Sequence, residues 1–335
     1  MSMPSGAVGP YCGSQFCTWW HAAGVVNTQT PVDPASVRQS RRYFVQVRSE
    51  GTNWSDSFVY ESIPRNGKGR VFSPWDPPGS DTLPEDVDDG VSQFEYTHNI
   101  SMAWSHFLLS EPVDIKILSR DSSLSTNVVI RPTALRYQVN ASEDGGIIVH
   151  VPFDPLGRKF SVEWPDDLLE YRSDGKDYVE APAGAVVGIE PARALLLFAS
   201  PFPSVDSVPE MTADNTRTMA PGPINNGDWG NSPILYFPPG VYWMNQAESS
   251  GLSPKLGESH IRLGANTSWV HLAPGAFVKA ALEYTTAAPV FHLTGAGTAR
   301  SWPSRSRFPC QAQTQRQPKY SATPQPLSHL RRTLG

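Results

Sequence analysis

The sequence lacks the long apolar run that a membrane-spanning helix requires, since no stretch of about 18 consecutive apolar residues occurs in it. It also lacks an excess of positive charge. Charged residues make up 18% of the chain and the formal net charge is -5, which is not the strongly basic balance typical of nucleic-acid-binding proteins. We therefore expect neither a membrane segment nor a nucleic-acid partner.

Uninterrupted helix-forming stretches are scarce as well. The chain of 335 residues contains 32 Pro and 26 Gly, which break regular helices. What is plentiful is bulky apolar surface, from 14 Phe, 11 Tyr and 10 Trp. Aromatic residues favour strands, and Pro and Gly favour tight turns, so the composition predicts an all-β fold.

Cysteine is rare, with three residues in the whole chain. Cys12 and Cys17 are close enough in the sequence CGSQFC to form a disulfide, whereas Cys310 lies alone. The same spacing would suit half of a zinc site, but no second Cys pair or close His pair accompanies it, so we expect no metal and no other cofactor. Two reduced thiols remain the alternative if the chain stays in the cytosol.

The signals for secretion disagree with one another. Four Asn-x-Ser/Thr sequons favour an extracellular, glycosylated protein, namely those at Asn53, Asn99, Asn140 and Asn266. The first ten residues, MSMPSGAVGP, have neither the basic start nor the apolar core of a signal peptide. No signal peptide is therefore visible in this chain.

Short strand patterns separated by turn residues fill the segment from 43 to 199. Clear examples are YFVQVR at 43–48, VDIKIL at 113–118 and GIIVHV at 146–151. This rhythm predicts an N-terminal antiparallel β-sandwich domain over 11–200. One stretch fits a helical stripe better than alternation, although strand signals on either side favour a strand, and its apolar residues are Ile100, Ala103, Trp104, Phe107 and Leu108.

A different pattern follows a Pro-rich segment over 201–233, which we interpret as a linker. ILYFPPGVYWM at 234–244 is matched 35 residues later by WVHLAPGAFVK at 269–279. Strand-corner-strand units that repeat in this way predict the start of a parallel β-helix over 234–297, in which each rung stacks on the next. Two similar hairpins inside one sandwich are the alternative.

Paired carboxyl groups are the first candidates for glycosidic chemistry. Asp88-Asp89 and Asp166-Asp167 each lie beside Gly or Pro, where Asp is usually a turn former, and adjacent strand residues point to opposite faces. Residues 86–90 resemble a calcium loop but lack the ligand spacing of one. No G-x-S-x-G nucleophile elbow occurs, so we assign no catalytic residue from these patterns.

Aromatic clusters could stack on sugar rings. The two strongest are Trp19-Trp20-His21 and Tyr242-Trp243. Packing in a core or at an interface is the competing and more common reason for such clusters.

Longer strings carry more information than these short patterns. They run in order over most of the chain, and they are CGSQFCTWWH at 12–21, NTQTPV at 27–32, DSFVYESIPRNGKGR at 56–70, GRKFSVE at 157–163, PGPINNGDWG at 221–230 and ILYFPPGVYWMNQ at 234–246. These strings resemble the fungal members of the dextranase and isopullulanase family of glycoside hydrolases, family 49. The likeness extends from about Tyr11 to Gly297.

The resemblance implies a secreted, monomeric enzyme that hydrolyses internal α-1,6 links of dextran, an α-glucan, with inversion. It also implies an N-terminal β-sandwich followed by a right-handed parallel β-helix. In that family the catalytic groups are aspartates on later rungs, and no position here matches those motifs. We therefore expect a truncated, inactive family member, with a non-catalytic carbohydrate-binding or interaction module as the alternative.

The departure from the family pattern begins after Gly297. No Asp or Glu follows Glu283, and seven Lys and Arg occur from Arg300 onward. Because the whole chain has a net charge of -5, residues 1–299 alone have a net charge of -12. The segment 298–335 is rich in Pro, Gln, Ser and Arg, so we predict an unrelated basic tail that is disordered.

Overall fold

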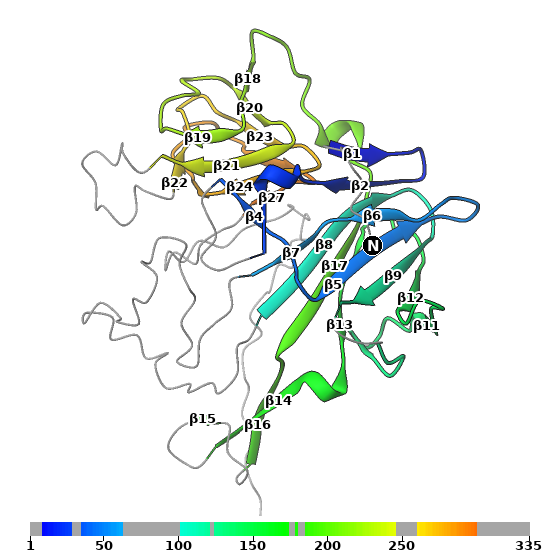
Figure 1. Ribbon diagram of the computed structural model, residues 1–335. Helices are drawn as coiled ribbons and strands as arrows, with labels where there is room; N and C mark the ends of the chain where they lie inside the picture. Colours follow the sequence, from blue (N-terminus) through cyan, green and yellow to red (C-terminus); the bar gives the residue numbers. More distant parts are fainter. Residues whose placement is uncertain are drawn as a thin grey trace, which may run out of the picture. The chain divides into compact units, whose positions relative to one another are not determined.

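The computed structural model describes residues 9–28, 35–62, 101–120, 124–173, 178–179, 185–245 and 260–299. Strands dominate this part of the chain, as Figure 1 shows, and three short 3₁₀ turns accompany them: Ala23–Val25, Pro165–Asp167 and Val205–Ser207. No helix among the described residues is long and apolar enough to cross a membrane. The all-β prediction is confirmed.

The first layer of the sandwich is a seven-stranded sheet. Its order is β1 (Gly9–Cys12), β2 (Phe16–Trp20), β8 (Ser101–Leu109), β17 (Arg193–Pro201), β13 (Arg158–Glu163) and β10 (Val129–Arg131), with β7 (Val59–Glu61) also paired to β8. The long strands β8 and β17 run parallel, and the other pairs are antiparallel.

The second layer is an antiparallel five-stranded sheet. Its order is β11 (Gln138–Ala141), β12 (Ile147–Val151), β9 (Val113–Ser119), β5 (Tyr43–Arg48) and β6 (Ser55–Ser57). Alternate residues of β5, β9 and β12 are buried, so one face of this sheet packs on the first layer and the other faces outward. The shared core includes Val45, Ile115, Phe107 and Leu197. The predicted sandwich is therefore confirmed.

The segment with a helical stripe is a strand, so a helix prediction there is wrong. In β8, Ala103, Ser105 and Phe107 are buried on one side and Leu108 is buried in a separate cluster with Trp19. Trp104 packs against a third cluster. Because both faces of this central strand are covered, apolar residues occur on both, and the resulting sequence mimics helical spacing.

Two smaller sheets complete the N-terminal part of the described chain. β14 (Leu168–Ser173) pairs with β15 (Tyr178–Val179) and with β16 (Ala185–Pro191), and both pairings are antiparallel. The short strands β3 (Val26–Asn27) and β4 (Val37–Arg38) form a parallel pair.

Three parallel sheets follow and form the first rungs of a β-helix. The first contains β18 (Thr216–Thr218), β20 (Ile234–Phe237), β23 (Trp269–Leu272) and β26 (His292–Gly295). The second contains β19 (Gly222–Ile224), β21 (Gly240–Met244), β24 (Ala276–Lys279) and β27 (Thr298–Ala299), and the third contains β22 (His260–Arg262) and β25 (Ala281–Glu283). Their inward side chains share a separate core that includes Leu235, Phe237, Tyr242, Ile261 and Val270. The β-helix prediction is confirmed over the alternative of two hairpins in a sandwich.

The Pro-rich segment interpreted as a linker contributes strands to this β-helix. Thr216 pairs with Ile234, and Gly222 pairs with Tyr242, so a rung begins inside residues 201–233. These strands are only three residues long, too short for periodicity to reveal them.

The predicted disordered tail begins at residue 298, but Thr298 and Ala299 form β27 and pair with Phe277 and Val278, so the prediction is wrong for these two residues. The remainder of the predicted tail, 300–335, lies outside the described residues.

The corner between β23 and β24 explains the repeated Pro-Gly in the sequence. Gly275 has a φ of 84°, a conformation that L-residues other than Gly rarely adopt. The residue numbers of paired positions differ by 35 before the corner, where Ile234 pairs with Trp269, and by 36 after it, where Gly240 pairs with Ala276. The two matching strings are thus neighbouring rungs whose corners differ by one residue.

Aromatic side chains connect the β-helix to the sandwich strands. The ring of Tyr60 stacks on Phe277 of β24 with centroids 5.1 Å apart, and on Trp104 of β8 with centroids 5.3 Å apart. Phe58 and Val241 belong to the same buried cluster. Part of the aromatic surface noted in the sequence therefore serves as packing.

Candidate functional site

A hollow of about 790 Å³ opens on the sandwich where several strand ends and turns meet. The turn between β1 and β2, the turn between β5 and β6, the start of β9 and the end of β12 all contribute to it. Its lining is mostly polar and consists of Gln15, Arg48, Ser49, Glu50, Gly51, Thr52, Glu111, Pro112, Val113, Asp114 and His150. This is the concave polar site from which we build a functional hypothesis.

Three cross-strand neighbours form the floor of the hollow. Asp114 on β9 is directly opposite Arg48 on β5 and His150 on β12. Val47, Val113 and Val149, each next in sequence to one of these residues, are buried in the core, so alternation places the three polar side chains on the outward face. The regular strand pairing therefore sets their spacing.

The carboxylate of Asp114 orients its two neighbours. Arg48 donates from Nε and Nη2 to Oδ2 of Asp114, at 3.2 and 3.0 Å, and His150 Nδ1 lies 3.1 Å from Oδ1. A carboxylate oxygen only accepts hydrogen bonds, so Nδ1 of His150 carries a proton. In the neutral imidazole, Nε2 is then the free acceptor.

Arg48 is also held from its other side. Its guanidinium carbon lies 4.2 Å from the ring centroid of Trp54, and Lys116 Nζ lies 4.8 Å from the same centroid. Lys116 in turn forms a 3.0 Å ion pair with Asp144. Cation–π contacts and hydrogen bonds together restrict the Arg48 side chain before any ligand arrives.

Gln15 enters the hollow from the hairpin loop that the disulfide closes. Ser49 Oγ donates to its Oε1 at 3.0 Å, and the side-chain NH₂ is the donor group of the same amide. The backbone carbonyl of Gln15 accepts from the Ser110 amide at 2.8 Å. Thr52 Oγ1 donates to the Ser49 carbonyl at 2.9 Å and so stabilises the adjoining turn.

Two further acids complete the rim. Glu50 is exposed and Glu111 is half-buried, and both line the hollow. Among the residues that the structure describes, no group of three or more His, Cys, Asp or Glu side chains could hold a metal ion. The hollow thus combines hydrogen-bond donors and acceptors without forming a cation cage.

A second polar feature lies on the outward face of the β-helix. Trp269 stacks on His292 with ring centroids 4.4 Å apart, and its Nε1 donates to Thr294 Oγ1 at 2.7 Å. His271 stacks on Tyr236 and its Nδ1 lies 2.9 Å from the same Thr294 oxygen. These rings stack along the rungs and His271 is buried, so we interpret them as a stabilising ladder.

The disulfide predicted from the sequence is present. Cys12 and Cys17 are paired across the β1–β2 hairpin and joined through their sulfur atoms. Of the sequons, Asn53, Asn140 and Asn266 are exposed, whereas Asn99 lies outside the described residues. Cys310, Asp88-Asp89 and the acidic stretch 86–90 also lie outside them.

The other candidates are structural in this fold. Asp167 pairs with Arg42 and with Arg193, each at 3.1 Å, as expected for a non-catalytic carboxylate. Trp19, His21 and Tyr242 are almost completely buried, so they cannot serve as sugar-stacking platforms. The other two members of these clusters, Trp20 and Trp243, are partly buried and pack against the buried cluster that contains Tyr60. Packing explains these aromatic clusters.

Sequence reasoning missed the hollow, because its residues come from segments far apart in the chain. The signal that was available lies in the strand strings. YFVQVR, VDIKIL and GIIVHV each place a charged or titratable residue next to a core position, namely Arg48, Asp114 and His150. Aligning the three requires the strand order and register, which the strings do not specify.

Comparison with known proteins agrees with this architecture. The sequence model of the glycosyl hydrolase family 49 N-terminal Ig-like domain matches residues 7–202. The chain is 58% identical over 291 residues to a dextranase of Talaromyces minioluteus, which covers 86% of this chain and 47% of the relative. It is 36% identical over 287 residues to an isopullulanase of Aspergillus niger, which covers 85% of this chain and 43% of the relative.

A solved structure gives the same result. Dex49A from Penicillium minioluteum matches with a TM-score of 0.75 and 55% sequence identity, over 88% of this chain and 51% of that chain. The chain thus spans about half the length of the relatives it matches. Identity at this level, a matching fold and a matched N-terminal domain show that the chain belongs to glycosyl hydrolase family 49.

Proposed function

We propose that this chain is the α-glucan-recognising N-terminal portion of a dextran-hydrolysing glycosidase. The reaction of the whole enzyme is inverting endo-hydrolysis of α-1,6-glucosidic links. The observation that carries the proposal is the 58% identity to a dextranase over 86% of the chain, against 36% for the isopullulanase. This difference favours dextran over pullulan as the polysaccharide partner.

We further propose that the chain alone binds α-glucan without hydrolysing it. Hydrolysis with inversion needs two carboxyl groups on opposite sides of the scissile bond, with room for a water molecule. Several carboxylates among the described residues instead form ion pairs with arginine side chains. Glu163 pairs with Arg131, and Asp154 pairs with Arg158.

Secretion as a monomer is part of the same proposal. It is supported by three exposed sequons and by the Cys12–Cys17 disulfide, which persists in oxidising compartments. Within the chain we propose a sandwich domain over 11–200, followed by β-helix rungs that begin within the segment 201–233 and continue through 234–297.

The test uses the purified chain in native gels that contain dextran, pullulan or hydroxyethylcellulose. Dextran should retard migration at lower concentration than pullulan, and hydroxyethylcellulose should not retard it. A parallel assay for reducing ends should show no release from dextran above a buffer blank. Equal migration in all gels would contradict α-glucan recognition, and measurable release would contradict the absence of hydrolysis.

A further inference from the structure

We propose that the hollow on the sandwich is a binding site for a neutral sugar, a glucose unit of an α-glucan chain. This inference rests on the proposed function, since it assigns α-glucan recognition to particular residues. The residues that carry it are Gln15, Arg48, Glu111, Asp114 and His150.

The hydrogen-bonding groups of the hollow match a polyhydroxyl ligand. A sugar hydroxyl both donates and accepts, so its site needs donors and acceptors side by side. The NH₂ of Gln15 and the guanidinium of Arg48 supply donors, whereas Glu111 and Nε2 of His150 supply acceptors. Planar side chains of this kind can engage two adjacent hydroxyls of one ring.

The same residues disfavour ligands of other classes. The carboxylates of Glu50 and Glu111 would repel an anion at the rim. The guanidinium of Arg48 would repel a metal cation, and no metal-binding cluster occurs among the described residues. The predominantly charged and amide lining also offers little to an apolar ligand. A neutral polar molecule is what remains.

The groups are held in place before binding. Asp114 fixes Arg48 and His150 through hydrogen bonds of 3.0 to 3.2 Å, and Ser49 fixes Gln15 at 3.0 Å. Restricting these side chains in advance lowers the entropy lost when a ligand is bound. A volume of about 790 Å³ lies within the range of roughly 300–1,000 Å³ found for small-molecule pockets.

The experiment measures isomaltotriose binding to the full chain by titration calorimetry. The test variant is the double substitution His150→Ala with Glu111→Ala, which removes one acceptor from the floor of the hollow and one from its rim. Each lost hydrogen bond to the sugar should weaken binding by about tenfold. We therefore expect the double variant, which loses two such bonds, to bind about a hundredfold more weakly than the wild type.

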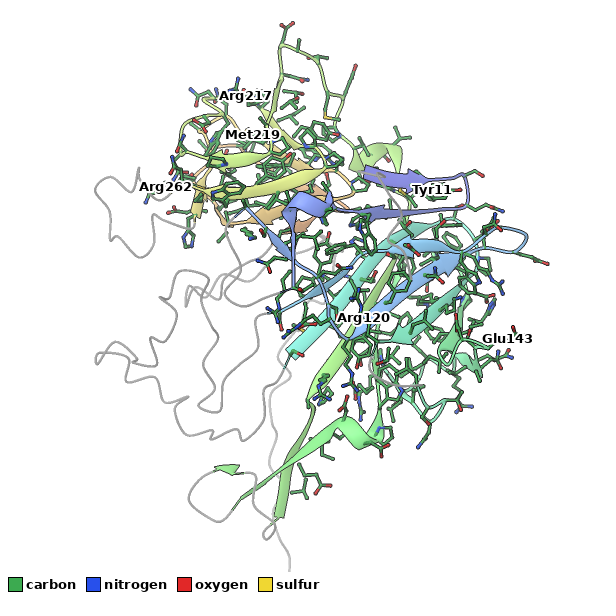
Figure 2. All side chains as sticks on the ribbon, in the orientation of Figure 1. Tyr11, Arg120, Glu143, Arg217, Met219 and Arg262 are labelled. Atoms are coloured by element: carbon green, nitrogen blue, oxygen red, sulfur yellow. A yellow bond between two sulfur atoms is a disulfide. The ribbon has the colours of Figure 1, made fainter. Side chains whose placement is uncertain are left out.

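Two controls separate a lost contact from a damaged fold. Glu143→Ala removes an exposed carboxylate from the β11–β12 turn, which lies outside the hollow. Figure 2 shows Glu143 on a different part of the sandwich from Tyr11 on the β1–β2 hairpin. This variant should bind as the wild type does. The urea midpoint of the double variant should match that of the wild type. The variant Glu111→Gln keeps an acceptor oxygen, so it should lose less affinity for isomaltotriose than Glu111→Ala.

The outcomes distinguish this inference from the proposed function. If the wild type is retarded by dextran while the double variant binds isomaltotriose equally well, the hollow is not the site and the proposed function stands. If the wild type binds neither isomaltotriose nor dextran, both fail. Titrations with sodium sulfate and calcium chloride serve as probes for ions, and a response to either without one to isomaltotriose would overturn the assignment to a neutral sugar.

Discussion

The hydroxyl of Tyr60 lies 2.7 Å from Nε2 of His21, inside the buried part of the protein. The same hydroxyl accepts a hydrogen bond from Trp19 Nε1 at 3.1 Å. The indole can only donate, so the Tyr60 oxygen accepts that bond, and where Nε2 of His21 carries no proton the hydroxyl donates to it. This arrangement favours a neutral imidazole, and protonation of Nε2 would remove the acceptor.

Acid should therefore destabilise the fold through its buried histidines. Burial lowers the pKa of His21 to about 4, and burial together with nearby Lys159 lowers the pKa of His106 to about 4. The unfolded chain binds a proton at each position near pH 6.5, so stability is greatest above pH 6.5 and falls as the pH drops towards 4. At pH 4.5 each histidine should lower the free energy of unfolding by about 2 to 3 kcal/mol relative to pH 7.

Urea unfolding of the wild type and of His21→Gln at pH 7 and pH 4.5 measures this effect. The Gln side chain can still accept from Tyr60, but it does not titrate, so the difference in the free energy of unfolding between the two pH values should shrink by about 2 to 3 kcal/mol. Leu156→Gln, at a position that is 90% exposed, introduces the same side chain without removing a histidine and should leave the difference unchanged. An unaltered pH dependence in His21→Gln would contradict the role of His21.

A second prediction concerns the contribution of the sandwich core to stability. Ile117 is fully buried and pairs with Val45 and Ile147 on the neighbouring strands. Ile117→Ala should lower the free energy of unfolding by about 2 to 5 kcal/mol, because it removes buried methyl groups and leaves a cavity. Leu156→Ala, at a position that is 90% exposed, should change it by less than about 0.5 kcal/mol. Similar losses in the two variants would count against the core described above.

The strands that could be predicted from the sequence were those whose apolar and polar residues alternate within one short segment. Alternation in Val113, Ile115 and Ile117 predicted β9, because one face of that strand is buried and the other is not. Alternation of apolar and polar residues did not reveal β8, because Trp104 packs in one cluster while Phe107 packs in another on the opposite face. A strand covered on both sides has no polar face to reveal its period.

The same distinction applies to the sites. The Cys12–Cys17 disulfide was predictable because its partners lie five residues apart in one hairpin. The contact of Arg48 with Asp114 spans 66 residues and depends on which strands are neighbours in the sheet. Strand order and register arise from packing of the whole core, so local pattern could not place these residues in one hollow.

The corner glycine gives a third prediction. Gly275 adopts a φ of 84°, and a Cβ there would lie 3.5 Å from Cβ of Pro239, so space is available but the backbone is strained for other residues. Gly275→Ala should lower the free energy of unfolding by about 1 to 2 kcal/mol. Gly24→Ala is the control, since Gly24 shows no positive φ and no atom lies within 4 Å of its added Cβ. Thermal unfolding should rank Gly275→Ala below both Gly24→Ala and the wild type.

Reduction of the disulfide provides the last prediction, and it connects stability to the hollow. The ring closed by Cys12 and Cys17 contains Gln15, whose side chain faces Ser49. Opening a ring this small should lower the free energy of unfolding by roughly 2 kcal/mol, because the unfolded chain regains conformational freedom. Dithiothreitol should therefore lower the urea midpoint of the wild type.

The loop that carries Gln15 should also become less ordered on reduction. Because a preordered donor loses less entropy on binding, isomaltotriose affinity should fall in the reduced protein while the rest of the sandwich remains folded. The control is the variant Cys12→Ser, whose affinity should already match that of the reduced wild type and should not respond to dithiothreitol. If reduction lowers the urea midpoint but leaves affinity intact, ordering of the Gln15 loop by the disulfide contributes nothing to sugar binding.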